Sequence, residues 1–93
     1  MRFEWDAAKA KGNEEKHGVT FDESTTVFGD PLALTFADAE HSESEPRHLT
    51  FGLSSRNRAL VVAHTSRGDN IRIISARVMT PRERRHYEQY GQR

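Results

Sequence analysis

The sequence predicts an α+β fold, in which one domain contains an antiparallel sheet of about four to five strands, with two N-terminal helices and one C-terminal helix. Four apolar runs between residues 32 and 78 are separated by loops too short for the crossover that parallel strands need. A capping box at residues 80–83 then marks the start of the last helix. Because 93 residues suffice for a single core, residues 1–93 are expected to form one domain.

The first part of the chain predicts a strand and two helices. Residues 2–5, RFEW, form a short apolar run, and Asp6 is a favourable N-cap for a helix over residues 7–17. Gly18 is suited to end that helix. A second, shorter helix is expected to begin at Asp22. The first helix has few apolar residues, so we expect it to pack only lightly on the sheet.

Four strands are expected in the second part of the chain. They are LALTFA (32–37), RHLTFGLS (47–54), ALVVAHT (59–65) and IRIISARV (71–78), joined by an acidic loop over 38–46 and by two turns. Arg72 and Arg77 are five residues apart, so a regular strand points them to opposite faces unless a bulge intervenes. In such a regular strand Ile71, Ile73 and Ser75 share the face of Arg77.

The last helix is predicted from its first turn. Thr80 is the cap, Pro81 occupies the first helical position and Glu83 completes the capping box. Tyr87 and Tyr90 form one apolar stripe, so the helix is expected to dock through both tyrosines. The arginines of this helix are then expected to face outward.

Composition argues against several classes of function. The absence of cysteine excludes disulfides and thiolate metal sites and fits a reducing cytoplasm. The five histidines lack metal-site spacing, and the sequence contains neither a phosphate-binding glycine loop nor a nucleophile elbow. No apolar run approaches the ~20 residues of a membrane helix, and the N-terminal segment lacks the apolar region of a secretory signal. We therefore expect a cytoplasmic protein without cofactor, metal or membrane partner.

The charges are unevenly distributed although the net charge is zero. Residues 18–46 contain seven acidic residues and no Lys or Arg, whereas residues 47–93 contain ten arginines and three acidic residues. A fold that separates the two parts would present a basic face to RNA or DNA, and a fold that brings them together would pair the charges internally. The charge pattern leaves both arrangements open.

Cleavage of RNA without a metal needs few side chains, because RNA supplies its own nucleophile, the 2′-OH. The protein then has to supply a base, an acid and cations that stabilise the phosphorane charge. The candidates are Lys16 and His17 at a helix end, Glu45 and Arg47 on one face of a strand entry, and Arg72 and Arg77 on the last strand. Each pair also has a structural explanation: a helix C-terminus favours cations, the second pair could form a salt bridge, and the two arginines could pair with acids or brace the junction with the last helix.

Three segments of the chain resemble the BrnT family, the toxin half of a bacterial type II toxin–antitoxin pair. They are FEWDAAKAKGNEEKHGVTFDESTTVFGDP, SESEPRHLTFGLS and RIISARVMTPRERRHYE. The motifs W-D…N…K-H-G-V-x-F and R-I-I-S-A-R…E-R match in order and spacing over nearly the whole chain. The resemblance implies a compact RelE-like ribonuclease fold and RNA cleavage that halts translation and growth. It also implies a neighbouring BrnA antitoxin with a ribbon-helix-helix domain, and a complex that represses its own operon by binding operator DNA.

The polar motif residues of the family carry over onto the six candidates. These are Lys16, His17, Glu45, Arg47, Arg72 and Arg77. The hypothesis is that Lys16 or Glu45 acts as the base and His17 as the acid, and that Arg47 and Arg77 hold phosphate. Pro46 departs from the family, which tends to have an acidic or another polar residue there. Because proline fixes φ, it stiffens the strand entry and affects the orientation of Glu45.

Two other functions fit parts of the sequence. A catalytically inactive binding module that docks an antitoxin and co-represses its operon would have the same sequence features, and ribonuclease activity distinguishes the two. A direct DNA-binding domain is less well supported. The last helix is basic, but it has too few apolar positions for a packed helix-turn-helix.

Overall fold

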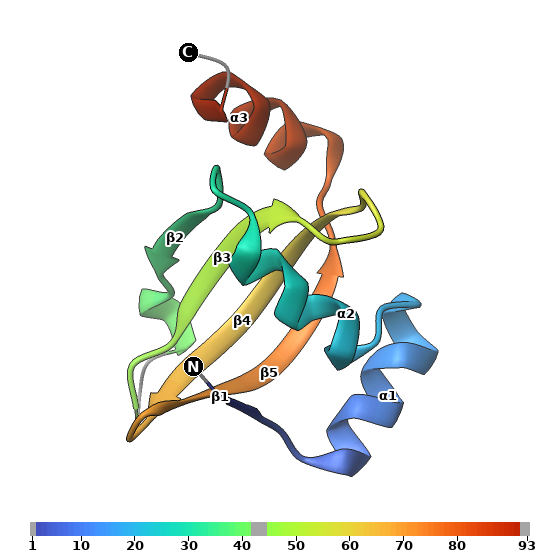
Figure 1. Ribbon diagram of the computed structural model, residues 1–93, viewed down its shortest axis with the longest axis vertical. Helices are drawn as coiled ribbons and strands as arrows, with labels where there is room; N and C mark the ends of the chain where they lie inside the picture. Colours follow the sequence, from blue (N-terminus) through green and yellow to red (C-terminus); the bar gives the residue numbers. More distant parts are fainter. Residues whose placement is uncertain (1, 42–44, 92–93) are drawn as a thin grey trace.

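The computed structural model describes residues 2–41 and 45–91, which form one five-stranded sheet with helices on both sides (Figure 1). The elements are β1 (Arg2–Glu4), α1 (Ala7–His17), α2 (Phe21–Thr25), η1 (Thr26–Gly29), β2 (Leu34–Ala37), η2 (Ala39–His41), β3 (His48–Leu53), β4 (Ala59–Arg67), β5 (Asn70–Val78) and α3 (Pro81–Gly91). Within the described ranges, no helix is long and apolar enough to cross a membrane. The α+β prediction is confirmed; residues 42–44 of the predicted acidic loop lie outside the described residues.

The strand order is β1-β5-β4-β3-β2. The pairs from β2 to β5 are antiparallel, as the short connections predict. The expectation of a wholly antiparallel sheet is wrong for β1, which pairs with β5 in parallel. The strand predicted from Leu32 begins two residues later, at Leu34, because Asp30 accepts a hydrogen bond from the Leu32 N–H at 2.9 Å and holds this segment in a turn.

A bulge in β5 determines which side chains share a face. Ile73 pairs with His64 and Ser75 pairs with Ala63, so Ile74 is an extra residue in the ladder. Ile73 and Ala76, three residues apart, therefore both lie in the core beneath the helices. The prediction that Ile71 and Ile73 share the face of Arg77 is wrong for the same reason.

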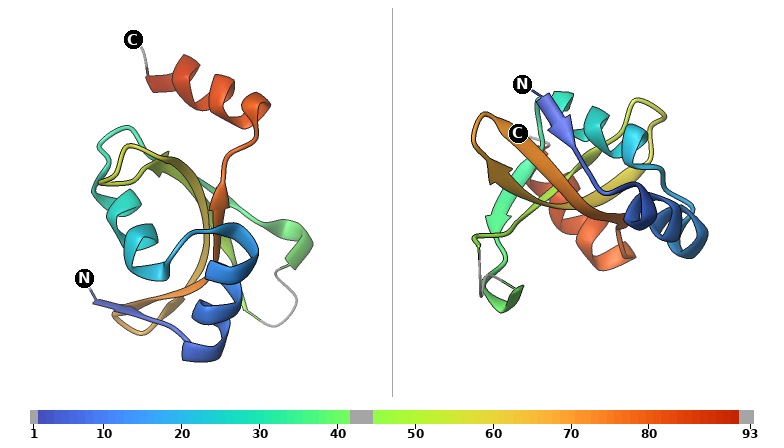
Figure 2. Two further views of the ribbon diagram at one scale, coloured as in Figure 1. Left: turned by 90° about the vertical axis from the view of Figure 1, so that its right-hand side faces the viewer. Right: turned by 90° about the horizontal axis from the view of Figure 1, so that it is seen from below.

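The two faces of the sheet bury different cores. We call the face beneath α1, α2 and η1 the covered face; its core includes Phe21, Val27, Leu60 and Val62. We call the opposite face, on which α3 packs at one end, the open face. Figure 2 shows α2 and α3 on opposite sides of the sheet, with α1 beside the edge formed by β5. The core of the open face is smaller, and Tyr87 is the residue by which α3 enters it.

Helix α3 docks through only one of the two tyrosines that were predicted to dock it. The capping box forms, because Thr80 Oγ1 accepts from the Glu83 N–H at 3.2 Å and Glu83 Oε1 accepts from the Thr80 N–H at 2.8 Å. Tyr87 is buried and its hydroxyl donates to Asp30. Tyr90 is 51% exposed, so the prediction that it helps to dock the helix is wrong.

Helix α1 is attached through one buried amide rather than through apolar surface. The side-chain N–H₂ of Asn13 donates to the carbonyls of Val19 at 3.0 Å and Ala76 at 2.8 Å, and its oxygen accepts from the Ala76 N–H at 3.0 Å. Because β1 pairs only with the first part of β5, this amide occupies the place of a neighbouring strand farther along the same edge. The expectation that α1 packs only lightly on the sheet therefore did not include the Asn13 amide, which is the main attachment of this helix.

We expect Asn13→Ala to destabilise the protein by about 2–4 kcal/mol, because it leaves the buried Ala76 backbone groups without partners. Asn13→Asp should also destabilise, since a carboxylate would face two carbonyls and could not donate to them. Urea denaturation at pH 7 measures both effects. Glu14→Ala, an exposed position on the same helix, is the control and should change stability by less than about 0.5 kcal/mol. An Asn13→Ala variant as stable as this control would contradict the assignment.

Candidate nucleic-acid cleavage site

The structure divides the six predicted site residues into two groups at opposite ends of β5. One group contains Lys16, His17 and Arg77, and the other contains Glu45, Arg47 and Arg72. The bulge at Ile74 turns Arg72 and Arg77 to the same, open face, which resolves the difficulty posed by their spacing. With a rise of ~3.3 Å per residue, the two arginines are separated by about 16 Å along the strand.

The first group lies where β5 ends. Asn13 binds Ala76, and residues three and four positions later lie on the same helix face, so Lys16 and His17 are turned toward this end of β5. The left-handed Gly18 ends α1 there, and its carbonyl accepts from Arg58 at 3.0 Å. Lys16 is exposed and His17 is half-buried. Both residues therefore lie at the same end of β5 as Arg77.

Arg77 is held in place by Glu83. Its Nη1 donates to Oε1 at 2.7 Å and its Nη2 donates to Oε2 at 2.9 Å. This ion pair lowers the pKa of Glu83 from 4.5 to about 2, with the Thr80 N–H contributing, and it raises the pKa of the Arg77 guanidinium. The Nε–H and one Nη2–H of Arg77 have no hydrogen-bond partner among the described residues, and the side chain is 40% exposed. That free edge can bind two oxygens of a phosphate.

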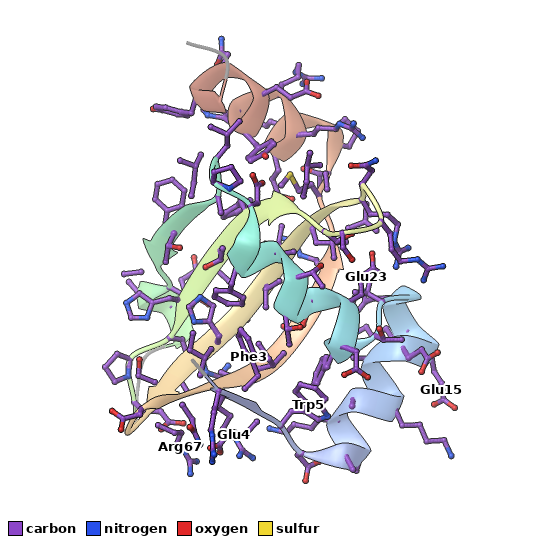
Figure 3. The ribbon with its side chains drawn as sticks, viewed as in Figure 1. Phe3, Glu4, Trp5, Glu15, Glu23 and Arg67 are labelled. Atoms are coloured by element: carbon purple, nitrogen blue, oxygen red, sulfur yellow. The ribbon has the colours of Figure 1, made fainter. Side chains whose placement is uncertain are left out.

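The second group lies at the β4–β5 turn. Arg72 donates to Glu4 at 3.0 Å, and Asn70 donates to the other oxygen of Glu4 at 2.9 Å; these hydrogen bonds lower the pKa of Glu4, that from Asn70 most. Glu45 lies 3.7 Å from Arg67, and both side chains are largely exposed. Figure 3 shows Glu4 and Arg67 together at this end of the sheet.

Arg47 belongs to this second group. Its carbonyl accepts from the Asp38 N–H at 2.8 Å, which continues the β2–β3 ladder, and the carbonyl of Pro46 accepts from Thr65 at 2.5 Å. Alternation from Leu49 places the Arg47 side chain on the open face. Arg47 therefore approaches the same face of the sheet as Arg72 and Arg77 of β5.

The separation of the two groups places Glu45, one of the two candidate bases, far from His17. A general base and a general acid must each reach the same phosphodiester within hydrogen-bond distance. His17 and Arg77 lie at one end of the strand and Glu45 at the other, so Glu45 and His17 cannot serve one phosphate. Lys16 remains beside His17.

Sequence reasoning missed the residues that orient these cations. Glu83 was recognised as part of a cap but not as the partner of Arg77, and Glu4 was not recognised at all. The alternation of β1, with Phe3 packed on the covered face, could have placed Glu4 on the open face. Its partner Arg72 could not have been identified, because the parallel pairing of β1 with β5 has no local sequence signal.

A buried histidine lies outside both groups. His64 is on the covered face, where its Nε2 lies 2.7 Å from the Thr50 hydroxyl and its ring contacts Phe28 edge-on. Burial, and to a smaller extent the neighbouring His48, lower its pKa to about 4. His64 is therefore neutral at physiological pH and serves packing. Among the described residues, no three His, Asp or Glu side chains are grouped so as to hold a metal ion.

Comparison with known proteins identifies the family. The model of the ribonuclease toxin BrnT of type II toxin–antitoxin systems matches residues 5–83. The chain belongs to the BrnT family. The crystal structure of the Brucella abortus ribonuclease toxin BrnT has a TM-score of 0.67 with this chain at 22% identity, covering 86% of this chain and 97% of that chain. No curated protein matches the sequence.

Membership of the BrnT family confirms the predicted resemblance and identifies the chain as a ribonuclease toxin of a type II toxin–antitoxin system. The structural likeness to the Brucella protein confirms the fold. That the fold is RelE-like stays a prediction, as do the roles of the six candidate residues.

The Arg77–Glu83 pair predicts a defined pH dependence of stability. Because the pKa of Glu83 is depressed from 4.5 to about 2, its contribution is complete above pH 4.5 and is lost as pH falls toward 2. The depression corresponds to at most about 3 kcal/mol. We expect Glu83→Gln to be about 1–3 kcal/mol less stable than wild type at pH 7 and equally stable at about pH 2. Urea denaturation across this range measures the difference.

The control is Glu88→Gln, which removes the exposed pair with Arg84 and should cost less than about 0.5 kcal/mol at every pH. A constant difference between Glu83→Gln and wild type from pH 7 to 2 would show that the carboxylate charge is not the stabilising element.

Proposed function

We propose that this BrnT-family chain is a metal-independent endoribonuclease that cleaves cytoplasmic RNA and so halts translation and growth. The observation that carries the proposal is the bulge at Ile74, which turns Arg72 and Arg77 to one uncovered sheet face. Arg47 reaches the same face. A strand of RNA along this face would meet several cations along its length, as the binding of single-stranded nucleic acids requires.

Cleavage is proposed at the Arg77 end of β5, which is also the end at which Lys16 and His17 complete α1. Lys16 takes the proton of the 2′-OH, the 2′ oxygen attacks phosphorus, and the 5′ oxygen leaves with a proton from His17. The products are a 2′,3′-cyclic phosphate and a 5′-OH. The free edge of Arg77 binds the developing phosphorane charge, and Glu83 fixes its orientation. Arg72 and Arg47 hold phosphates farther along the strand.

The partner in this proposal is a BrnA-like ribbon-helix-helix antitoxin encoded beside the toxin. Because a type II antitoxin is a protein, it has to block the ribonuclease by direct contact. The proposed toxin–antitoxin complex binds operator DNA through the antitoxin alone. The open face of the toxin is then free for inhibition rather than for DNA recognition.

The chemistry predicts cleavage that is independent of divalent metal and dependent on the 2′-OH. Purified protein should cleave RNA at the same rate with excess EDTA as with Mg²⁺, because the nucleophile comes from the RNA. A substrate with a single 2′-deoxy at the scissile nucleotide should resist, whereas the same RNA with the 2′-deoxy one nucleotide away should be cleaved. Gel analysis measures both. Loss of cleavage in EDTA with restoration by Mg²⁺ would contradict the mechanism.

Substitutions at the proposed centre should separate catalysis from stability. We expect His17→Ala to lower the cleavage rate by about 10²–10⁴-fold and Arg77→Lys by about 10²–10³-fold, since lysine cannot bind two phosphate oxygens at once. Single-turnover cleavage rates and melting temperatures measure the two properties. His86→Ala and Arg84→Lys, exposed positions on α3, are the matched controls. An Arg77→Lys variant that melts earlier but cleaves normally would make Arg77 a structural brace.

A further inference from the structure

A groove on the open face lies between α3 and the edge of the sheet. Its floor and walls are Leu34 and Phe36 of β2, Leu49 and Phe51 of β3, and Tyr87 and Tyr90 of α3, and its volume is about 360 Å³. This volume accommodates two or three large apolar side chains. The side chains proposed to contact RNA do not line the groove, whereas Glu83, which orients Arg77, does.

Two aromatic rings of the groove face solvent. Phe36 is 52% exposed and Tyr90 is 51% exposed, although both lie beside buried apolar residues. Phe36 packs edge-on against Phe51 at 5.8 Å between ring centroids, which fixes its position. An ordered, apolar and uncovered surface of this kind is typical of a protein interface.

The wall of the groove that α3 provides is positively charged. Arg82 and His86 line the groove, and a neighbouring hollow is lined by Arg82, Arg85 and His86 together with Glu88. Arg82 and Arg85 form no ion pair with any described residue, whereas Glu83 and Glu88 are paired with Arg77 and Arg84. The unneutralised charge of this wall favours an acidic ligand.

The floor distinguishes a peptide from RNA. Leu34 and Leu49 form half of it, and aliphatic side chains offer no flat face on which a base can stack. The edge-on contact of Phe36 with Phe51 orients these two rings for packing against branched side chains. Apolar side chains flanked by carboxylates fit both the floor and the wall.

We propose that the groove binds an acidic amphipathic segment of the protein antitoxin, with two or three large apolar side chains on the floor and Asp or Glu beside Arg82 and Arg85. This inference rests on the proposed antitoxin partnership and assigns its contact surface. It places inhibition on α3, the helix that also orients Arg77 through Glu83.

The test uses the full chain and the antitoxin encoded by the adjacent gene, with Kd measured by calorimetry. Phe36→Ser and Tyr90→Ala should each raise Kd by about tenfold or more. Arg82→Glu should raise Kd and weaken its salt dependence, because it reverses a charge at the interface. Val78→Ser is the matched control: Val78 is 48% exposed, lies outside the groove and should leave Kd within about twofold.

RNA cleavage by each free variant is measured in parallel and should equal that of wild type, because none of these side chains belongs to the proposed cleavage centre. Unchanged Kd in all three groove variants would overturn the assignment of the groove. Lost cleavage with unchanged Kd would overturn it in favour of an RNA site. Failure of wild type itself to bind the antitoxin would overturn the partnership, and with it the groove assignment.

Discussion

The extra residue at Ile74 is the constraint on which the arrangement of both faces depends. Without it, Ile73 and Ala76 would lie on opposite faces, and the core beneath α1 and α2 would lose one of them. With it, the two arginines of β5 emerge together on the open face. The same backbone irregularity therefore completes the core and places the two arginines on one face.

Helix α3 connects the cleavage centre to the rest of the fold through two carboxylates. The Asp30 carboxylate accepts hydrogen bonds from the Tyr87 hydroxyl, from the Leu53 N–H at 2.8 Å and from the Leu32 N–H. Burial raises the pKa of Asp30, but these hydrogen bonds outweigh burial and lower the pKa overall. Glu83 accepts from Arg77. Burial, with the hydrogen bond to Asp30, raises the pKa of Tyr87 to about 12, so this contact persists at physiological pH. Glu83, the partner of Arg77, therefore belongs to the same helix that lines the groove.

Local signals predicted the elements well. Alternation in residues 47–54 and 59–65 and the capping box at 80–83 identify their strands and helix because each depends on neighbouring residues alone. The sequence left the bulge as an alternative and could not locate it. The run IRIIS places isoleucines on both faces of a strand, with or without an extra residue, so the apolar pattern does not mark the bulged position. Nothing in RFEW specifies a parallel partner.

The site was predicted less completely than the fold for a related reason. The six candidates were identified by type and by family resemblance, but their grouping depends on contacts between distant segments. Glu4 with Arg72 and Asn13 with Ala76 are separated by more than sixty residues, and neither member carries a local signal for the other. The sequence therefore identifies the six candidate residues but not their division into two groups.

Asn13 also has a consequence for self-association. A strand edge with free N–H and C=O groups is a template for pairing with another chain. The Asn13 amide satisfies both backbone groups of Ala76, and β1 pairs with the beginning of the same strand, so β5 is shielded from an added strand at both places. The edges of the sheet are instead β1, of three residues, and β2, of four residues. Strand addition at either edge would therefore form few backbone hydrogen bonds.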